Sequence, residues 1–247
     1  MFELFHIPAF RTLFTAQIIA LIGTGLTTIA LALLAFELAG NGASIVLGTA
    51  LAIKMTAYVF ISPVITGLIS HKNQKQYLIL FDLWRAIIVM MLFFVTSIWQ
   101  IYVLIFFLQA FSAGFTPIHQ SVISDILKND SLFIKGASLS RIAYNLENIL
   151  SPTFAILILT FINYSSFFIF NTICFLLSSL LIFITNFPQE KIKKNEKSPL
   201  WQRAISGITL FLKNRNLLAI LSLKIQIYHS RQFLKKHKLV TRLVIRL

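Results

Sequence analysis

The chain has 247 residues, of which 57% are hydrophobic and only 12% are charged. Soluble domains carry roughly twice that share of charged residues, and the apolar residues here lie in blocks long enough to require lipid around them. A net charge of +14 would suggest nucleic acid as the partner of a soluble protein. Here the basic residues lie between the apolar blocks and near the end of the chain, which indicates membrane topology and argues against nucleic-acid binding.

Six apolar blocks follow one another along the chain. They cover residues 13–38, 45–69, 77–98, 101–126, 137–162 and 167–187. Each block reaches the roughly 20 residues that a helix needs to cross the hydrocarbon core of a bilayer. The sequence therefore predicts an all-α integral membrane protein, with a bundle of six transmembrane helices over residues 1–187.

The gaps between the blocks differ in their content of basic residues. The gaps before the first block and after the second, fourth and sixth hold Arg11, Lys72, Lys75, Lys128, Lys135, Lys191, Lys193, Lys194 and Lys197. The alternate gaps, residues 41–44, 97–100 and 163–166, hold no Lys or Arg. The positive-inside rule then places the N-terminus and the region after the sixth helix in the cytoplasm.

Beyond residue 187 the chain becomes polar and basic. Residues 188–215 are expected to form a cytoplasmic linker with an amphipathic surface helix. Its apolar face would consist of Trp201, Ala204, Ile205, Ile208, Phe211 and Leu212. A seventh apolar run begins at Leu217 but meets Lys224 too soon to cross a membrane. Residues 216–247 are therefore expected to be a shortened seventh helix followed by a basic tail.

Three short motifs stand out on this predicted topology, one in the loop after the second helix and two inside helices. After the second helix, Gly67, Lys72 and Lys75 match a transporter loop signature in which Gly, Leu-Ala-Asp-Arg and Gly are followed by two basic residues. His71 stands where that signature has its Asp, and Gln74 stands where it has its second Gly.

The other two motifs lie inside helices. The third helix opens with Asp82-Leu83-Trp84-Arg85, and the fifth contains Glu147-Asn148-Ile149-Leu150-Ser151-Pro152, similar to an antiporter Gly-Pro signature with Ser151 replacing Gly. Taken together, the three motifs resemble the N-terminal six-helix half of a major facilitator superfamily transporter. The resemblance is strongest to the multidrug and siderophore exporters of that family.

The resemblance implies half of a major facilitator fold, built from two three-helix repeats of inverted topology. It also implies a bacterial inner-membrane protein that exports a small amphipathic solute, drug-like or siderophore-like, by proton antiport, without a cofactor or enzyme activity. Because the chain ends as a second half would begin, we expect a truncated transporter. The alternatives are an inactive remnant, or a half-transporter that needs a homodimer partner or a second half.

Apart from Glu37 and Asp125 at the ends of their blocks, five charged residues lie inside the predicted helices. An ion there costs roughly 2.5–3.5 kcal/mol at the bilayer centre and therefore usually faces a partner or water. Glu147 and Asp82 are the proton-coupling candidates, and Arg85, Arg141 and Lys54 are their possible partners. Asp82 can pair with Arg85 in its own helix, which leaves Lys54 with Glu147. Alternatively, Asp82 pairs with Arg141 and Arg85 with Glu147. All five can also serve only to neutralise one another.

Polar uncharged residues interrupt the same apolar blocks. The resemblance implies a substrate path built from the first, second, fourth and fifth helices, so Gln17, Gln109, Asn145 and Asn148 are candidates to line a cavity. The alternative is that they form interhelical hydrogen bonds. One cysteine, Cys174, makes neither an internal disulfide nor a zinc site, and we expect no metal.

Overall fold

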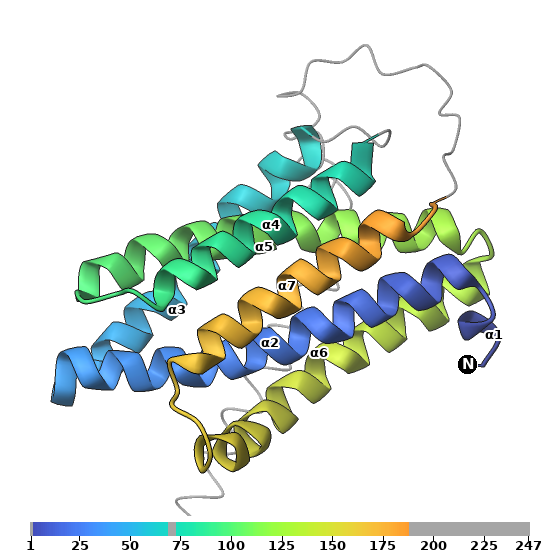
Figure 1. Cartoon of the computed structure of the whole chain (residues 1–247). Coiled ribbons are helices and arrows are strands. Elements are labelled where there is room, and N and C mark those ends of the chain that lie inside the picture. Colours follow the sequence, from blue (N-terminus) through green and yellow to red (C-terminus); the bar gives the residue numbers. More distant parts are fainter. Residues whose placement is uncertain (1, 69–72, 188–247) are drawn as a thin grey trace, which may run out of the picture. The chain divides into compact units, whose positions relative to one another are not determined.

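The computed structural model of the chain describes residues 2–68 and 73–187, and Figure 1 shows its ribbon. The elements in chain order are α1 Phe2–Phe5, α2 Pro8–Ala39, the short 3-10 turn η1 Gly40–Gly42, α3 Ala43–Leu68, α4 Gln74–Leu92, α5 Ile98–Ile126, α6 Asp130–Leu159 and α7 Ser166–Ile184. Within these residues there is no strand, and α2 to α7 correspond one by one to the six predicted membrane helices. The all-α bundle is therefore confirmed.

Four continuous helical stretches are long and apolar enough to cross a membrane: Pro8–Ser62, Ile98–Ile126, Asp130–Leu159 and Ser166–Ile184. The first of these contains α2 and most of α3, because η1 joins the two without an extended break. α4 is not among the four, since its 19 residues include Lys75, Asp82 and Arg85. It nevertheless packs along both α5 and α7, so α4 is part of the bundle.

Local chemistry fixes where several helices begin and end. Ser97 and Gln100 form a capping box at the start of α5. At the start of α6 the Asn129 side chain accepts a hydrogen bond of 2.9 Å from the Ser131 backbone N–H. α2 has Pro8 in its first turn and ends at Gly40, whose φ of 51° lies in the region that favours glycine.

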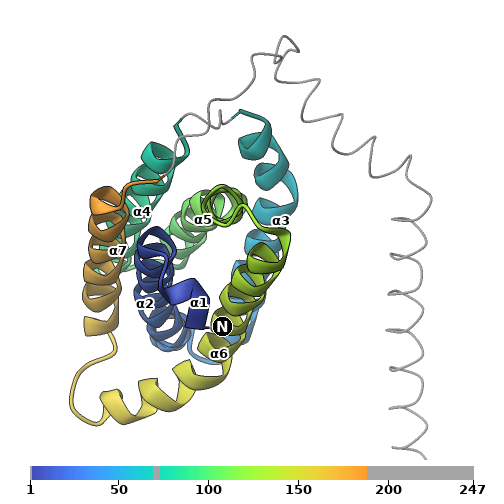
Figure 2. The same ribbon diagram turned by 90° about the vertical axis from the view of Figure 1, so that its right-hand side faces the viewer.

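The first three and the last three long helices have equivalent neighbours. α2 packs against α6 and α7, as α5 packs against α3 and α4, while α4 and α7 pack against each other. Figure 2, which views the bundle from its end, shows α2 between α7 and α6. Exchanging α2–α4 with α5–α7 thus preserves these contacts, as expected for two related three-helix repeats.

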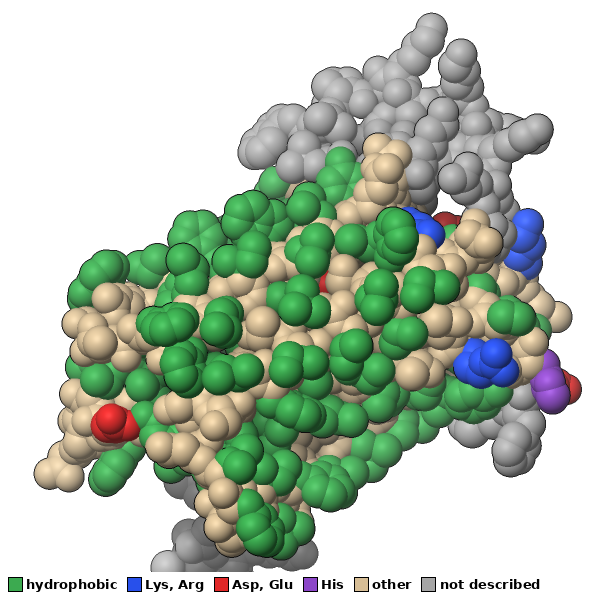
Figure 3. All heavy atoms as spheres, in the orientation of Figure 1, with side chains coloured by type: hydrophobic (Ala, Val, Ile, Leu, Met, Phe, Trp, Pro, Cys, Tyr) green, Lys and Arg blue, Asp and Glu red, His purple; other side chains and the backbone are tan. Residues whose placement is uncertain are grey.

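Two apolar clusters close the bundle toward its two ends. The cluster nearer η1 includes Leu34, Val46 and Phe167, and the cluster nearer α1 includes Phe10 and Leu127. Large apolar side chains also cover the outside of the bundle, where a membrane protein meets lipid. On the face drawn in Figure 3, Lys, Arg and His side chains gather toward the end that holds α1.

The predicted linker helix at residues 188–215 and the tail at residues 216–247 lie outside the described residues. His71 and Lys72 of the loop motif also lie outside them.

Candidate functional site

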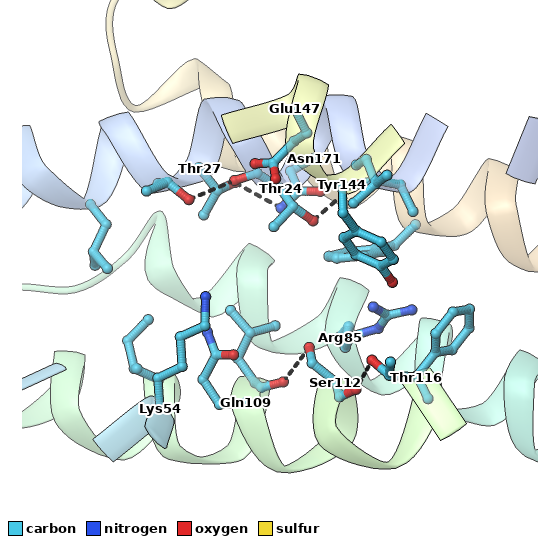
Figure 4. A pocket seen from close by; sticks show the side chains of 18 of the residues that line it. Thr24, Thr27, Lys54, Arg85, Gln109, Ser112, Thr116, Tyr144, Glu147 and Asn171 are labelled. Atoms are coloured by element: carbon cyan, nitrogen blue, oxygen red, sulfur yellow. Dashed lines mark hydrogen bonds between the residues drawn. The ribbon is translucent and has the colours of Figure 1, made fainter. Parts of the chain in front are cut away.

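A cavity of about 250 Å³, called here the central cavity, lies between the two apolar clusters and receives side chains from all six long helices. The polar and charged residues that line it are Gln17, Thr24, Thr27, Thr28, Lys54, Tyr58, Arg85, Gln109, Ser112, Thr116, Tyr144, Glu147, Asn148 and Asn171. Figure 4 shows most of these side chains turned toward a common space. A membrane bundle that places so many polar groups on its inner walls can hold water or a polar solute.

Glu147 and Lys54 stand on opposite walls of the central cavity. In Figure 4 the Glu147 carboxylate from α6 and the Lys54 amine from α3 both extend into the space between the walls. The two groups attract each other electrostatically, although they form no direct ion pair in the described part of the chain. Since α3 and α6 are not neighbours in the bundle, this attraction acts across the cavity.

Asp82 and Arg85 form a separate ion pair within α4. Asp82 also accepts a hydrogen bond of 2.7 Å from the Ser178 hydroxyl, and its side chain is fully buried. The Arg85 guanidinium lies over the rings of Phe115 and Phe175, 4.1 and 4.5 Å from their centroids. Of this pair only Arg85 lines the central cavity, so Asp82 has no access to it.

Of the first pairing arrangement, the Asp82–Arg85 pair is formed, while Lys54 and Glu147 face each other across the cavity without a direct ion pair in the described residues. The bridges from Asp82 to Arg141 and from Arg85 to Glu147 are not formed, because α4 packs along α5 and α7 and not along α6.

A second cavity of about 450 Å³, called here the lower cavity, lies between α3, α5 and α6 on the side nearer α1. Arg141, His119 and Ser140 line it. Asp82 lines neither cavity, so Arg141 and Asp82 lie in different parts of the bundle. The two cavities share five lining residues, Lys54, Tyr58, Thr116, Tyr144 and Asn148. Side chains of α3, α5 and α6 thus form a common wall between them.

The four predicted cavity candidates all lie on a cavity wall. Gln17, Gln109 and Asn148 line the central cavity, and Asn145 and Asn148 line the lower one. Gln17 also donates a hydrogen bond of 3.4 Å to the Ser140 carbonyl, while Asn148 donates one of 2.8 Å to the Tyr144 carbonyl in its own helix. Lining and hydrogen bonding therefore occur together at Gln17 and Asn148, and their part in binding a substrate stays a prediction.

Of the motif residues, Arg85, Glu147 and Asn148 line the central cavity, whereas the loop motif and the Ser-Pro step do not. Gly67 lies in the last turn of α3. Lys75, in the first turn of α4, places its amine 5.7 Å from the centroid of the Phe183 ring. Ser151 lies against Gly25 of α2, and Pro152 follows it inside α6. The contact between Gly25 and Ser151 marks the close approach of α2 and α6 next to Glu147.

Several polar residues of the site were not predicted from the sequence. Asn171 of α7 donates a buried hydrogen bond of 2.7 Å to Thr27 of α2, at the wall of the central cavity. Asn171 lies in the sixth block, which has no charge, and Tyr144 is an aromatic residue among polar neighbours. The spacing of seven residues between Asn171 and Ser178, two turns of one helical face, is the signal that marks an inward face of α7.

At the end of the bundle nearer η1, a single polar contact joins Glu37 of α2 to the α6–α7 connection. The Tyr164 hydroxyl donates a hydrogen bond to Glu37 Oε2. Partial burial, followed by this hydrogen bond, raises the pKa of Tyr164 above its ordinary value. Glu37 lines neither cavity, so it offers a carboxylate against which Glu147 can be compared.

Comparison with known proteins agrees with this architecture. An uncharacterised MFS-type transporter of Bacillus subtilis (strain 168), YfiS, is 27% identical over 201 residues, which cover 74% of this chain and 47% of that protein. The chain thus spans about half the length of this curated relative. No solved structure matches. The family profile described as Major Facilitator Superfamily matches residues 13–230, and the chain belongs to that family of membrane transporters.

Proposed function

We propose that the chain takes part in proton-coupled export of a small amphipathic solute, with Glu147 as the group that binds and releases the proton. The observation that supports this most is the position of Glu147: among the carboxylates of the described residues, it alone lines the central cavity. The other intramembrane carboxylate, Asp82, is held by Arg85 and Ser178.

Because Lys54 faces Glu147, protonation of Glu147 would change the force between α3 and α6. While Glu147 is ionised, the opposite charges draw α3 and α6 toward each other across the cavity. Protonation of Glu147 removes this attraction and leaves Lys54 as a lone cation facing the cavity. α3 and α6 are not packed against each other, so this attraction is not opposed by a rigid contact between them. Binding of one proton can therefore shift the equilibrium between a bundle with a narrower cavity and one with a wider cavity. This is the coupling that a secondary transporter needs.

The proposal places the chain in a bacterial inner membrane, with α1 and the region after α7 on the cytoplasmic side. The amphipathic solute would occupy the central cavity, where hydroxyl and amide groups alternate with Leu31, Ile105 and Leu108. Transport by the bundle would take a second bundle, from another copy or from a separate half, because alternating access moves two bundles around a shared site. The competing proposal is a chain that transports nothing by itself.

The test is dye accumulation in a bacterial strain that lacks its main efflux pumps. We expect the wild-type chain to lower ethidium accumulation, and a protonophore to abolish this effect. Glu147→Gln keeps the shape of the side chain and removes the titrating group. Cells with this variant are expected to accumulate as much dye as cells with an empty vector. Glu37→Gln is the matched control and is expected to behave as wild type, since Glu37 lies outside both cavities.

Membrane fractions would first establish that every variant is inserted in equal amount. Inserted wild-type protein with empty-vector accumulation would contradict transport by copies of this chain alone and favour a chain that is inactive or needs a separate second half. Equal dye loss by wild type and Glu147→Gln would instead refute the role of Glu147 alone.

A further inference from the structure

Three buried polar atoms near the common wall of the two cavities have no hydrogen-bond partner among residues 2–68 and 73–187. They are Gln17 Oε1, His119 Nε2 and Ser140 Oγ, which come from α2, α5 and α6. Their side chains are only 2%, 3% and 7% exposed. Gln17 lines the central cavity, and the other two line the lower cavity. Buried polar groups are nearly always hydrogen-bonded, and in polar cavities the partner is commonly an ordered water.

Polar side chains connect these atoms to Glu147 along two helices. On α6, Ser140, Tyr144 and Glu147 are spaced by four and three residues, so they follow one helical face. His119 and Thr116, three residues apart, do the same on α5. All five line one or both cavities, and Thr116 and Tyr144 line both.

Tyr144 stands at the common wall of the two cavities. Thr116 of α5 and Tyr58 of α3 also line both cavities, so three helices contribute a hydroxyl to this wall. A phenol can donate and accept at once, so at this position it can join the hydrogen-bonded water of one cavity to that of the other. Polar residues therefore line both cavities, and the residues that the cavities share lie between the lower cavity and Glu147.

The η1 end of the central cavity, beyond Thr27, Lys54 and Gln109, is apolar. Toward η1, the central cavity ends at Leu31, Ile105 and Leu108, which pack on the apolar cluster that includes Leu34 and Val46. Such packing offers no hydrogen-bonding groups to water. The carboxylate thus has polar groups on both sides inside the cavity, and the apolar cluster closes the cavity farther toward η1.

We infer that Glu147 exchanges its proton with the α1 side of the membrane, through a water-filled route lined by Gln17, His119, Ser140, Thr116 and Tyr144. This inference rests on the proposed function, in which Glu147 is the proton site. The charged or titratable groups that face Glu147 are Lys54 and Tyr58 from α3, Arg85 from α4 and Tyr144 from its own helix. Around the cavity, α2, α5 and α7 contribute Thr24, Ser112 and Asn171, which do not titrate in this range.

The first measurement tests the route as a path for water. A Ser112→Cys variant in a Cys174→Ala background places one thiol in the central cavity, and membrane vesicles of each orientation are treated with the impermeant reagent sulfonatoethyl methanethiosulfonate. We expect labelling at least tenfold faster from the α1 side than from the other side. Thr116→Leu, which narrows the common wall, is expected to slow it about tenfold. Thr49→Leu is the matched control, because Thr49 lies half-buried on α3 and lines neither cavity.

The second measurement follows the proton itself. Dicyclohexylcarbodiimide modifies protonated carboxyl groups in membranes, and mass spectrometry of the Glu147 peptide quantifies the product. The pH on the two sides of the vesicles is set independently. We expect modification of Glu147 to increase severalfold when the pH of the α1 side alone is lowered from 9 to 6, and to stay constant when only the other side is acidified.

The outcomes separate the inference from the function on which it rests. Thiol labelling that is as fast from the η1 side, or modification of Glu147 that follows the pH of that side, would overturn the route while Glu147 kept its proton. An unmodified Glu147 at every pH, with Ser112→Cys still labelled from the α1 side, would refute Glu147 as the proton site and reduce the route to a path for water.

Discussion

The two charge pairs inside the bundle differ in how firmly the surrounding protein holds them. Asp82 and Arg85 are in direct contact, with Ser178 bonded to the carboxylate and two phenylalanine rings on the guanidinium. Glu147 and Lys54 face each other across a cavity without a direct ion pair in the described residues. A carboxylate that must gain and lose a proton needs the second environment, and a structural anchor needs the first.

Asp82→Asn is therefore expected to act on stability. It leaves the Arg85 guanidinium buried without its counter-charge, and breaking a buried pair in this way typically costs about 3–5 kcal/mol. The double variant Asp82→Asn/Arg85→Met removes both charges and is expected to recover most of the loss. The measurement is the thermal midpoint of the detergent-solubilised protein, followed by size-exclusion chromatography. An Asp82→Asn midpoint within 1 °C of wild type would show that Asp82 does not anchor Arg85.

Two helices that meet at a glycine determine where Glu147 lies. A Cβ added to Gly25 of α2 would overlap the Ser151 hydroxyl and lie 2.6 Å from Ser151 Cβ and 3.0 Å from Glu147 Oε1. Such close approach between helices is typical of small residues in membranes. Ser151 thus supports the glycine contact from α6, and both residues set the distance of Glu147 from α2.

Gly25→Ala is expected to push α2 and α6 apart and to destabilise the protein by about 1–3 kcal/mol, the usual cost of overpacking. Adding Ser151→Gly removes the nearest obstacle and is expected to restore part of the stability. Gly48→Ala serves as the matched control, because a Cβ there meets nothing within 4 Å. Thermal midpoints of the four proteins decide the matter, and equal midpoints for Gly25→Ala and Gly48→Ala would contradict the close contact.

The helices were largely predictable because lipid imposes a minimum length on apolar runs. The two largest errors have local causes. The third helix was predicted to residue 98 but ends at Leu92, since Phe93 and Phe94 continue the apolar run after the helix has stopped. The fifth was predicted from residue 137 but begins at Asp130. Its first turn is polar and is capped by Asn129, and a search for apolar runs cannot detect a polar turn.

The site was only partly predictable, because depth along a helix says nothing about which helices are neighbours. An Asp82–Arg141 pair was one of the two arrangements that the sequence left open, yet α4 does not pack along α6. Gln17 and Gln109 were recognisable as polar residues in apolar runs, and both line the central cavity. Tyr144 was not recognisable, since only the packing of α3, α5 and α6 places a tyrosine between two cavities.

At the scale of the whole molecule, the charged residues give the bundle two unlike ends. The α5–α6 connection, which carries Lys128, lies at the same end as α1, whereas η1 and the α6–α7 connection, without Lys or Arg, lie at the other. Basic residues are retained on the cytoplasmic side during insertion. The proton route inferred above would then open toward the cytoplasm, and the apolar cluster nearer η1 would face outward.

Single cysteines at the two ends test this orientation in a Cys174→Ala background. Ser131→Cys, at the exposed start of α6, is expected to react with an impermeant maleimide only in inside-out vesicles or permeabilised cells. Asn41→Cys, exposed in η1, is expected to react in intact cells. Labelling of Ser131→Cys in intact cells would show that the topology is the reverse of the expected one. Glu147 would then exchange its proton with the outside in this conformation, and the charge asymmetry of the loops would have failed to set the orientation of the bundle.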